Sequence, residues 1–357
     1  MKKKVKRWLG VVLSVVMVLS LCACGSKDDA NDSAGGNGSD VRVGLVSSSS
    51  GFGDGAFNDL TLRGFDKAKQ ELGIEYDKVG VKAVGDIELS LRDMAATEDY
   101  DLIIALTYEA IEAVKMVSDE YPDQNFAILD TVVEAPNVAS YLTTDEEASF
   151  VVGAAAALMK QSADVYGLSP EKKVGFIGGV DAPNIRIFYA GFAAGAKYID
   201  KEMVVLDDYV GGFTDITTTK EIANSMNNQG ADAIFHAAGT SGNGLFQAAK
   251  ENNTIAFGVN LNQNDLEPDV IAGSMIKNVD VAAYDAIKSV VDGNFEGKTR
   301  ILNMADGGVD MVTSGSNVEL SEEIIEKLDD IRAKIKTGEI VVPSTVEELA
   351  AYEASLN

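Results

Sequence analysis

Short runs of apolar and β-branched residues alternate with longer amphipathic stretches along most of this chain. The first run, Val41–Ser47 (VRVGLVS), predicts a buried strand, and the spacing of apolar residues in Phe57–Leu72 predicts a helix after it. Parallel strands need crossover connections, which are usually helices, so the regular alternation of the two patterns indicates right-handed βαβ units. The sequence therefore predicts an α/β fold in which mostly parallel sheets carry helices on both faces.

The alternation continues through the chain and restarts near residue 173. Further strands are predicted at Asp101–Ala105, Phe126–Leu129, Val138–Leu142, Lys173–Ile177, Met203–Leu206, Ala231–Phe235, Ile255–Val259 and Arg300–Met304. Further helices are predicted at Glu109–Glu120, Glu146–Lys160, Ile185–Ile199, Thr217–Gln229, Leu245–Asn252 and Val279–Asp292. A final helix is predicted to begin after the N-cap Ser321 and to end before Gly338. Two such series in one chain imply two α/β lobes.

The first 24 residues predict export and lipid attachment. A basic segment, residues 2–7, precedes the apolar stretch Trp8–Leu21, whose 14 residues fall short of the roughly 20 that span a membrane. Such a length is typical of a signal peptide. The sequence LCAC that ends at Cys24 resembles the lipobox of bacterial lipoproteins, so residues 1–23 are predicted to be a lipoprotein signal peptide and Cys24 to be lipidated. An uncleaved anchor is the alternative, and either one places the rest of the chain on the extracytoplasmic face of the cell membrane.

The segment after the lipobox predicts a spacer. Residues 25–40 contain no large apolar side chain, so burial cannot offset the entropy that ordering them would cost. We therefore expect residues 24–40 to form a flexible tether between the lipid and the folded lobes.

The charge and the scarcity of histidine and cysteine exclude several function classes. The chain has 56 acidic and 30 basic residues, a formal net charge of −26, which repels phosphate backbones and anionic lipid. Nucleic acid is therefore not a predicted partner. His236 is the sole histidine, and both cysteines lie within the first 24 residues, which leaves no Cys/His metal site in the folded part. No metal and no cofactor are predicted.

Two glycine-rich loops partly resemble motifs of other functional classes. Residues 51–56 (GFGDGA) fit the form of a dinucleotide-binding fingerprint, but four serines separate them from the preceding strand, where the fingerprint needs a tight turn. Residues 239–244 (GTSGNG) lack the lysine of a phosphate-binding loop and do not fit the nucleophile motif of hydrolases. An enzyme that uses His236 stays open as an alternative, although a lone histidine on a strand is more often a packing residue.

Loops that follow the predicted strands gather polar and aromatic side chains. Open α/β sheets bind their ligands in the crevice at the carboxyl ends of the strands. The candidate ligand-binding residues are Ser48, Phe57, Asn58 and Asp130 in the first half and Phe213, Gly239, Asn260 and Lys277 in the second. Aromatic rings from two lobes are suited to stacking on a flat ring, while the polar groups bond its edges.

Several segments occur in a distinctive order between about residues 41 and 345. They are VRVGLVSSSSGFGDGAFNDLTLRGFDKAKQELG, FAILD, VASYLTTDEEASFVVGAAAALM, KVGFIGG with AGFAAGAK, HAAGTSGNG, and SMIKNVDVAAYDAI with DGNF. Together they resemble the basic-membrane-protein family of lipoproteins, which are solute-binding proteins of ABC importers typified by purine nucleoside receptors.

The resemblance implies a type I periplasmic-binding-protein fold, with two doubly wound lobes joined by a hinge of several crossings. It also implies the lobe boundaries: lobe 1 at residues 41–143, to which about 262–305 return, and lobe 2 at residues 144–261, to which about 306–357 return. One ligand is then expected in the cleft between the lobes.

The resemblance further implies roles for single residues. Phe57 with Asn58 and the second aromatic, Phe213, match the family's purine clamp, and Asp130 matches the acid that closes the FAILD strand. Lys277 resembles the family's ribose-side donor. Two other positions carry Ser48 and Asn260 where the family has carboxylates. Because serine and asparagine both donate and accept hydrogen bonds, the ligand groups that they read can differ from those read by a carboxylate.

The resemblance implies a non-enzymatic, lipid-anchored extracytoplasmic receptor that binds a purine nucleoside such as adenosine, guanosine or inosine. Its expected partners are an ABC permease pair and a cytoplasmic ATPase. The same fold with a sugar, a nucleobase or another small solute is one alternative, and a ligand sensor without transport is another.

Overall fold

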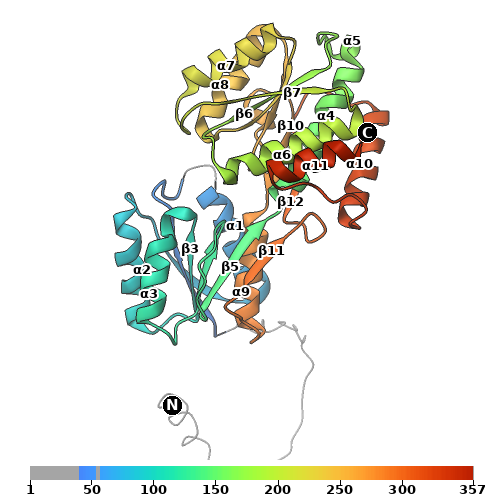
Figure 1. Ribbon diagram of the computed structural model, residues 1–357. Helices are drawn as coiled ribbons and strands as arrows, with labels where there is room; N and C mark the ends of the chain where they lie inside the picture. The colour runs from blue at the N-terminus through green and yellow to red at the C-terminus, as the bar shows by residue number, and fades with distance from the viewer. Residues whose placement is uncertain (1–39, 54–56, 357) are drawn as a thin grey trace, which may run out of the picture. The chain divides into compact units, whose positions relative to one another are not determined.

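The computed structural model describes residues 40–53 and 57–356 (Figure 1). The predicted signal peptide, the predicted lipidation at Cys24 and almost all of the predicted tether lie outside the described residues. Part of the first glycine-rich loop, residues 54–56, lies outside them as well.

Six of the described strands form a first, fully parallel sheet in the order β11-β5-β4-β3-β1-β2. They are β1 (Arg42–Val46), β2 (Glu75–Val79), β3 (Leu102–Leu106), β4 (Phe126–Leu129), β5 (Val138–Thr143) and β11 (Thr299–Leu302). Residues alternate between the two faces of each inner strand: Leu45 and Ile104 pack on one side, and Ile103 and Ile128 pack on the other. The sheet is therefore buried on both faces, as a sheet built from βαβ units requires.

Another six of the described strands form a second sheet in the order β12-β10-β9-β8-β6-β7. They are β6 (Lys173–Gly178), β7 (Val204–Tyr209), β8 (Ala233–Ala237), β9 (Ile255–Gly258), β10 (Ile271–Lys277) and β12 (Val309–Val312). All pairs in this sheet are parallel except β12, which runs antiparallel to β10. In both sheets the strand order reverses once, at β1/β3 and at β6/β8, and this switch point is where doubly wound sheets bind ligands.

Helices cover both faces of each sheet. The α-helices are α1 (Phe57–Leu72), α2 (Gly85–Thr97), α3 (Ile111–Glu120), α4 (Asp145–Gln161), α5 (Ala163–Tyr166), α6 (Pro183–Ile199), α7 (Ile216–Asn228), α8 (Asn243–Asn252), α9 (Val279–Val291), α10 (Glu322–Lys336) and α11 (Val346–Ser355). On the first sheet α1 and α9 share one core cluster, and α2 and α3 share the cluster on the opposite face. On the second sheet α4 and α6 lie on one face with α10 and α11, and α7 and α8 lie on the other.

Helices α4 and α6 approach each other closely because glycines line their contact. A Cβ added at Gly153 would lie 1.9 Å from the carbonyl oxygen of Phe192, and one added at Gly195 would lie 1.9 Å from that of Phe150. Only glycine permits this backbone-to-backbone distance. The alanine-rich run of α4 fills the remaining narrow space without forcing the helices apart.

The chain crosses between the two sheets three times within the described residues. The crossings join β5 to α4, β10 to α9, and β11 to β12. Backbone hydrogen bonds tie them to one another, from Thr144 N–H to Leu302 O (3.3 Å) and from Asn278 N–H to Gly308 O (2.8 Å). Figure 1 shows α9 and β11, both orange, beside the blue and green elements of the first sheet. The fold is thus two parallel-sheet α/β lobes joined by three crossings, as the sequence predicts.

The expected return of residues 262–305 to lobe 1 is wrong in its start. Strand β10 (Ile271–Lys277) pairs with β9 and β12 in the second sheet, so the chain crosses back only after Lys277. The apolar run of β10 is buried in the second lobe, where it contributes Ile271 and Met275 to the core. No Pro/Gly-rich linker marks the crossing, so composition gives no sign of it.

Most predicted elements are present within a few residues, and α1 has the predicted bounds. The predicted cap of α10 is also present, since the Ser321 side chain accepts a hydrogen bond from Ile324 N–H. The helix after Ser321 is not the final one, because α11 follows it. Sequence analysis also missed β2, β10, β12, α2 and α5.

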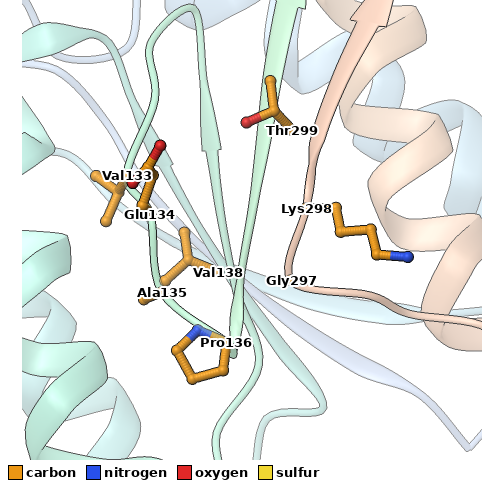
Figure 2. Close-up of a pocket in the computed structure, with 8 residues that line it drawn as sticks. All are labelled: Val133, Glu134, Ala135, Pro136, Val138, Gly297, Lys298 and Thr299. Atoms are coloured by element: carbon orange, nitrogen blue, oxygen red, sulfur yellow. The ribbon is translucent and has the colours of Figure 1, made fainter.

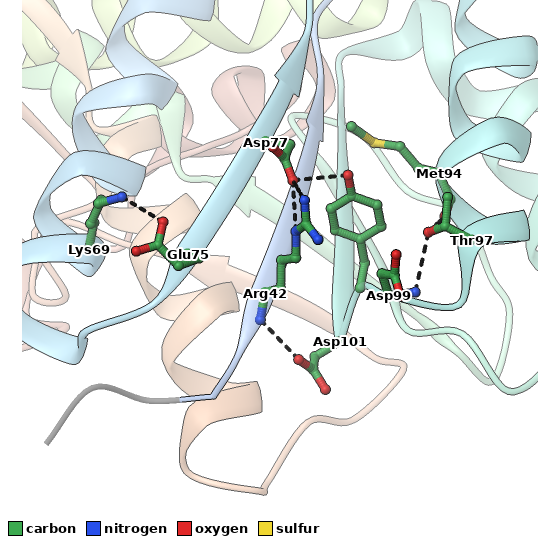
Figure 3. Close-up of polar contacts among 9 residues, drawn as sticks. Arg42, Lys69, Glu75, Asp77, Met94, Thr97, Asp99 and Asp101 are labelled. Atoms are coloured by element: carbon green, nitrogen blue, oxygen red, sulfur yellow. Dashed lines mark hydrogen bonds and ion pairs between the residues drawn. The ribbon is translucent and has the colours of Figure 1, made fainter. Parts of the chain in front are cut away.

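Polar side chains hold β2 as an edge strand. The Arg42 guanidinium pairs with Asp77 (Figure 3). Tyr100 Oη donates to the same carboxylate at 3.0 Å. Lys69 of α1 pairs with Glu75 at 2.7 Å. These half-exposed contacts take the place of the apolar alternation that marks the inner strands, so β2 gives no strong strand pattern in the sequence.

Candidate functional site

A cavity of about 320 Å³ lies at the carboxyl ends of strands from both lobes. The first lobe contributes Phe57 and Leu60, from the first turn of α1. The second lobe contributes the loop after β8, the loop after β9, and Lys277 at the end of β10. Four of the predicted ligand-binding residues line this cavity together: Phe57, Gly239, Asn260 and Lys277.

Ser48 and Asn58 bind each other at the base of the loop that leads to α1. Ser48 N–H donates to Asn58 Oδ1 at 2.9 Å, and Asn58 Nδ2 donates to Ser48 Oγ at 2.9 Å. Both residues are buried. Their reciprocal bonds fix the start of α1 against the end of β1, and so they set the position of Phe57 in the cavity wall.

Lys277 forms ion pairs with two carboxylates. Its Nζ lies 2.6 Å from Asp130 Oδ1, at the end of β4 in the first lobe, and 2.8 Å from Asp145 Oδ2, at the start of α4. Burial by itself lowers the pKa of Lys277, but the two carboxylates outweigh burial, and the net pKa lies above its ordinary value. Burial raises the pKa of Asp145, against the opposing effect of Lys277. The lysine is therefore a charged donor held in place from both lobes.

Lys277, Asp130 and Asp145 form a triad, and sequence analysis did not predict Asp145 as a member of it. The residue is the first of three consecutive acids at the start of α4, a common helix N-terminal pattern that gives no hint of a long-range partner. Its buried position and its contact with Lys277 depend on two chain crossings that meet only in the folded protein.

Asn260 lines the cavity and carries a buried acceptor. Its Oδ1 atom is buried and has no hydrogen-bond partner among the residues that the structure describes. Its backbone adopts φ 66°, in the left-handed region that asparagine tolerates better than most residues, and its carbonyl accepts from Lys277 N–H at 3.0 Å. A buried acceptor left without a donor is costly, so this atom fits a ligand that donates to it.

Phe213 lies beside the cavity and outside its lining. Its side chain is 37% exposed, and its ring packs on the backbone of Gly179, where an added Cβ would lie 2.2 Å from Phe213 Cε1. Its carbonyl accepts from Ser241 N–H at 2.9 Å, which fastens the loop to the turn that begins at Gly239. The two-ring clamp therefore stays a prediction for the ligand-bound form.

His236 is a buried packing residue on β8. Ala238 N–H donates to its Nδ1 (3.3 Å), and its Nε2 lies 3.2 Å from Gln263 Oε1. Its ring meets Phe246 edge-on at 5.2 Å. Burial lowers the pKa of His236 to about 4. The hydroxyl of Ser241, in the loop after this strand, donates to Gly212 O rather than to this ring.

A second cavity, of about 330 Å³, lies in the first lobe between the β4–β5 loop and the segment that enters β11 (Figure 2). Its lining residues are Val133, Glu134, Ala135, Pro136, Val138, Gly297, Lys298 and Thr299. It sits at the amino ends of β5 and β11, at the opposite end of these strands from the first cavity. The predicted site residues therefore point to the first cavity.

Within residues 40–53 and 57–356, no group of three or more His, Cys, Asp or Glu side chains is placed to hold a metal ion. Over the same ranges, no helix has the length and the apolar character needed to cross a bilayer.

Residues 41–346 match the family model described as Bmp, ABC transporter substrate-binding protein PnrA-like. The chain belongs to this family. The Bmp family consists of non-catalytic solute-binding proteins of ABC transporters, so the predicted family and the predicted lack of enzymatic activity are both confirmed. The enzyme alternative that used His236 is thereby excluded.

Three known proteins illustrate the similarity. An uncharacterised lipoprotein of Pyrococcus abyssi is 29% identical over 96% of this chain and 94% of its own. The ABC transporter nucleoside-binding protein BmpA of Lactococcus lactis is 28% identical over 96% of this chain and 100% of its own. A crystal structure of an ABC transporter solute-binding protein from Aeropyrum pernix superposes with a TM-score of 0.72 at 27% identity, covering 88% of this chain and 99% of its own.

Proposed function

We propose that this Bmp-family protein binds a purine nucleoside in the cavity at the carboxyl ends of its strands and delivers it to an ABC permease. The observation that carries the proposal is the combination found in that cavity: an aromatic ring, a buried acceptor and a charged donor. Its volume of about 320 Å³ falls at the small end of the range of about 300–1,000 Å³ that small-molecule sites occupy.

Each group has a distinct task in the proposed complex. Phe57 stacks on the flat base, which gains about 0.5–1.5 kcal/mol beyond the area that is buried. Asn260 Oδ1 accepts a hydrogen bond from the ligand. Lys277 uses two of its three N–H groups on Asp130 and Asp145, which leaves one for a ribose hydroxyl.

The geometry of the triad favours a neutral ligand. Two carboxylates share one ammonium in a buried site, so the triad carries a net negative charge when both are ionised. An anionic solute would be repelled at short range, whereas hydroxyl groups meet a donor and several acceptors. The printed name of the Lactococcus lactis relative, a nucleoside-binding protein, is in line with this choice.

Closure of the two lobes completes the proposed site. The three crossings supply a hinge, and Phe213 stands exposed beside Gly239, from where a rotation of one lobe brings its ring onto the base opposite Phe57. The closed form then docks on a permease pair that is driven by a cytoplasmic ATPase. We further propose that Cys24 carries the lipid that keeps the protein at the extracytoplasmic face of the membrane.

A different neutral solute is the second candidate, because Asn260 stands where the family resemblance has a carboxylate. A carboxylate accepts only, whereas the amide also donates, and so the cavity could instead suit a free nucleobase or a pentose. The charge of the triad would be compatible with these ligands as well.

Isothermal titration calorimetry of the purified protein separates the candidates. The panel is adenosine, guanosine, inosine, adenine, hypoxanthine, ribose and xylose. We expect binding of at least one nucleoside and a loss of about tenfold in its affinity in the variant Phe57→Ala. Phe52→Ala is the matched control, since this ring packs beside Gly80 and Lys78 outside the cavity. Tight binding of a sugar or a nucleobase without any nucleoside binding would contradict the proposal.

A further inference from the structure

The side chain of Gln263 is held in one orientation by two protein donors. Its Oε1 accepts from Val259 N–H at 2.8 Å and lies 3.2 Å from His236 Nε2. A carbonyl oxygen has two acceptor positions, so both are occupied. If the amide were turned over, its NH₂ group would face the Val259 N–H, donor against donor. Gln263 therefore keeps its Oε1 toward the protein.

The tautomer of His236 determines which atom is the donor in the bond between His236 and Gln263. Ala238 N–H donates to Nδ1, so the ring proton of the neutral imidazole lies on Nε2, and Nε2–H donates to Gln263 Oε1. Because burial lowers the pKa of His236 to about 4, the ring stays neutral at physiological pH. The sole histidine of the chain thus acts as a fixed donor behind Gln263.

Two glycines make room for this arrangement. A Cβ at Gly258 would lie 2.7 Å from Gln263 Oε1, and a Cβ at Gly242 would lie 2.0 Å from His236 Cε1. The backbone of Gln263 is fastened too, since its N–H donates to Ser274 Oγ at 3.0 Å. The neighbouring residue, Asn264, is fully buried and bonds Ser274 through its side chain. The amide of Gln263 is therefore positioned before any ligand arrives.

Gln263 is also part of the wall of the ligand cavity. Gln263 and Asn260 both line it, three residues apart on the loop after β9. With Oε1 committed to the protein, the group that Gln263 can offer is Nε2, a donor. Asn260 offers the opposite, an Oδ1 acceptor that lacks a partner within the described ranges.

We propose that Gln263 determines specificity by donating from Nε2 to an acceptor on the ligand, next to a ligand donor that is read by Asn260 Oδ1. The inference rests on the proposed nucleoside function and names the ligand's recognised edge: a neutral six-membered ring edge with an acceptor and a donor side by side. Inosine offers this pair as O6 and N1–H, and adenosine offers it as N1 and the 6-amino group. His236 is a positioning residue that acts through Gln263.

The variant Gln263→Glu tests the assignment with little change in shape. An oxygen still accepts from Val259 and His236, but the Nε2 donor becomes a second acceptor. We expect affinities for inosine and adenosine, measured by calorimetry, to fall at least tenfold. Gln247→Glu adds the same charge at an exposed position of α8 and should leave both affinities unchanged. Affinities of Gln263→Glu within twofold of the wild type for both nucleosides would overturn the inference.

Nuclear magnetic resonance of the histidine ring provides a readout that needs no ligand. With one histidine in the chain, the ¹⁵N ring signals are unambiguous. We expect the Nε2–H tautomer from pH 5 to 8 in the wild type, and a raised His236 pKa in Gln263→Glu because a carboxylate stabilises the imidazolium. A wild-type ring protonated on Nδ1 would turn the Gln263 amide over and overturn the inference whatever the ligand.

Failure of the proposed function and failure of the Gln263 inference give different experimental results. A wild-type protein that binds no nucleoside contradicts the proposed function and with it the purine edge, while the histidine tautomer still tests the orientation of Gln263. Nucleoside binding that is insensitive to Gln263→Glu contradicts the inference and leaves the proposed function intact.

Discussion

Replacing Lys277 by methionine isolates the energetic role of the triad at the cavity. The substitution removes the ammonium and keeps a side chain of similar length. Asp145, whose side chain is 11% exposed, then loses its ionic partner inside the protein. Removing one member of a buried ion pair typically costs about 3–5 kcal/mol, because the other charge stays buried. Asp130 is 32% exposed, so water compensates much of its loss. We therefore expect the variant to lose about 3 kcal/mol of unfolding free energy at pH 8, at the lower end of that range.

Urea unfolding followed by circular dichroism measures this loss. With a slope of about 3 kcal/mol per molar urea, the midpoint should fall by about 1 M. The double variant Lys277→Met/Asp145→Asn is the control, since it also removes the negative charge of Asp145 that Lys277→Met leaves unpaired by the lysine. We expect the double variant to recover at least half of the loss.

The pH dependence of this loss of unfolding free energy provides a second, independent test. Burial raises the pKa of Asp145 even beside Lys277, and removing the lysine raises it further. The folded state then binds a proton that the unfolded state releases, so unfolding free energy falls as pH rises. The loss in Lys277→Met should therefore shrink between pH 8 and pH 5. A loss below about 1 kcal/mol at pH 8, or an equal loss at both pH values, would refute the reasoning.

Three further predictions concern Phe213, the carboxyl group of Glu146 at the start of α4, and the packing of α4 against α6. Phe213→Ala should weaken nucleoside binding about tenfold in calorimetry, or about 1.4 kcal/mol; unchanged affinity would remove this ring from the site. Burial raises the pKa of Glu146 to about 7 from an ordinary 4.5, so its contribution to stability is present at pH 4 and lost as pH rises through 7. Glu146→Gln should flatten the pH dependence of thermal unfolding between pH 5 and 8 and add about 1 kcal/mol at pH 8; an unaltered pH profile would contradict this. Gly195→Ala should destabilise by about 2 kcal/mol or more, because its Cβ would lie 1.9 Å from Phe150 O. Gly85→Ala, whose added Cβ has no neighbour within 4 Å among the described residues, should change the melting temperature little, and equal effects of the two glycine variants would argue against close packing as the cause.

The fold class follows from patterns that are local in the sequence. Inner strands such as Phe126–Leu129 are apolar on both faces, and α1 has an apolar stripe, so each is visible in a short window. The edge strand Glu75–Val79 is not visible, because solvent covers one of its sides and its sequence, EYDKV, is mostly polar. Helix α11 escaped notice because Leu349 is its single residue classed as buried.

The site residues also differ in whether a short stretch of sequence reveals them. Residues at or just after the end of a strand, such as Lys277 and Asn260, were predicted from their place in the chain, because parallel strands bring their carboxyl ends together. Asp145 and Gln263 were not predicted. The role of Asp145 depends on a partner that is far away in sequence, and the role of Gln263 depends on which end of its side-chain amide faces the protein. Only the folded contacts Lys277–Asp145 and His236–Gln263 reveal those roles.

The first turn of α4 joins ligand recognition to the mechanics of the hinge. Glu147 accepts from Met304 N–H at 2.7 Å on the third crossing, while Asp145, two residues earlier, holds Lys277 on the second. One helical turn thus contacts all three connecting segments. We expect a solute that accepts a hydrogen bond from Lys277 to act directly on this turn, and so to couple its own binding to any rotation of the lobes.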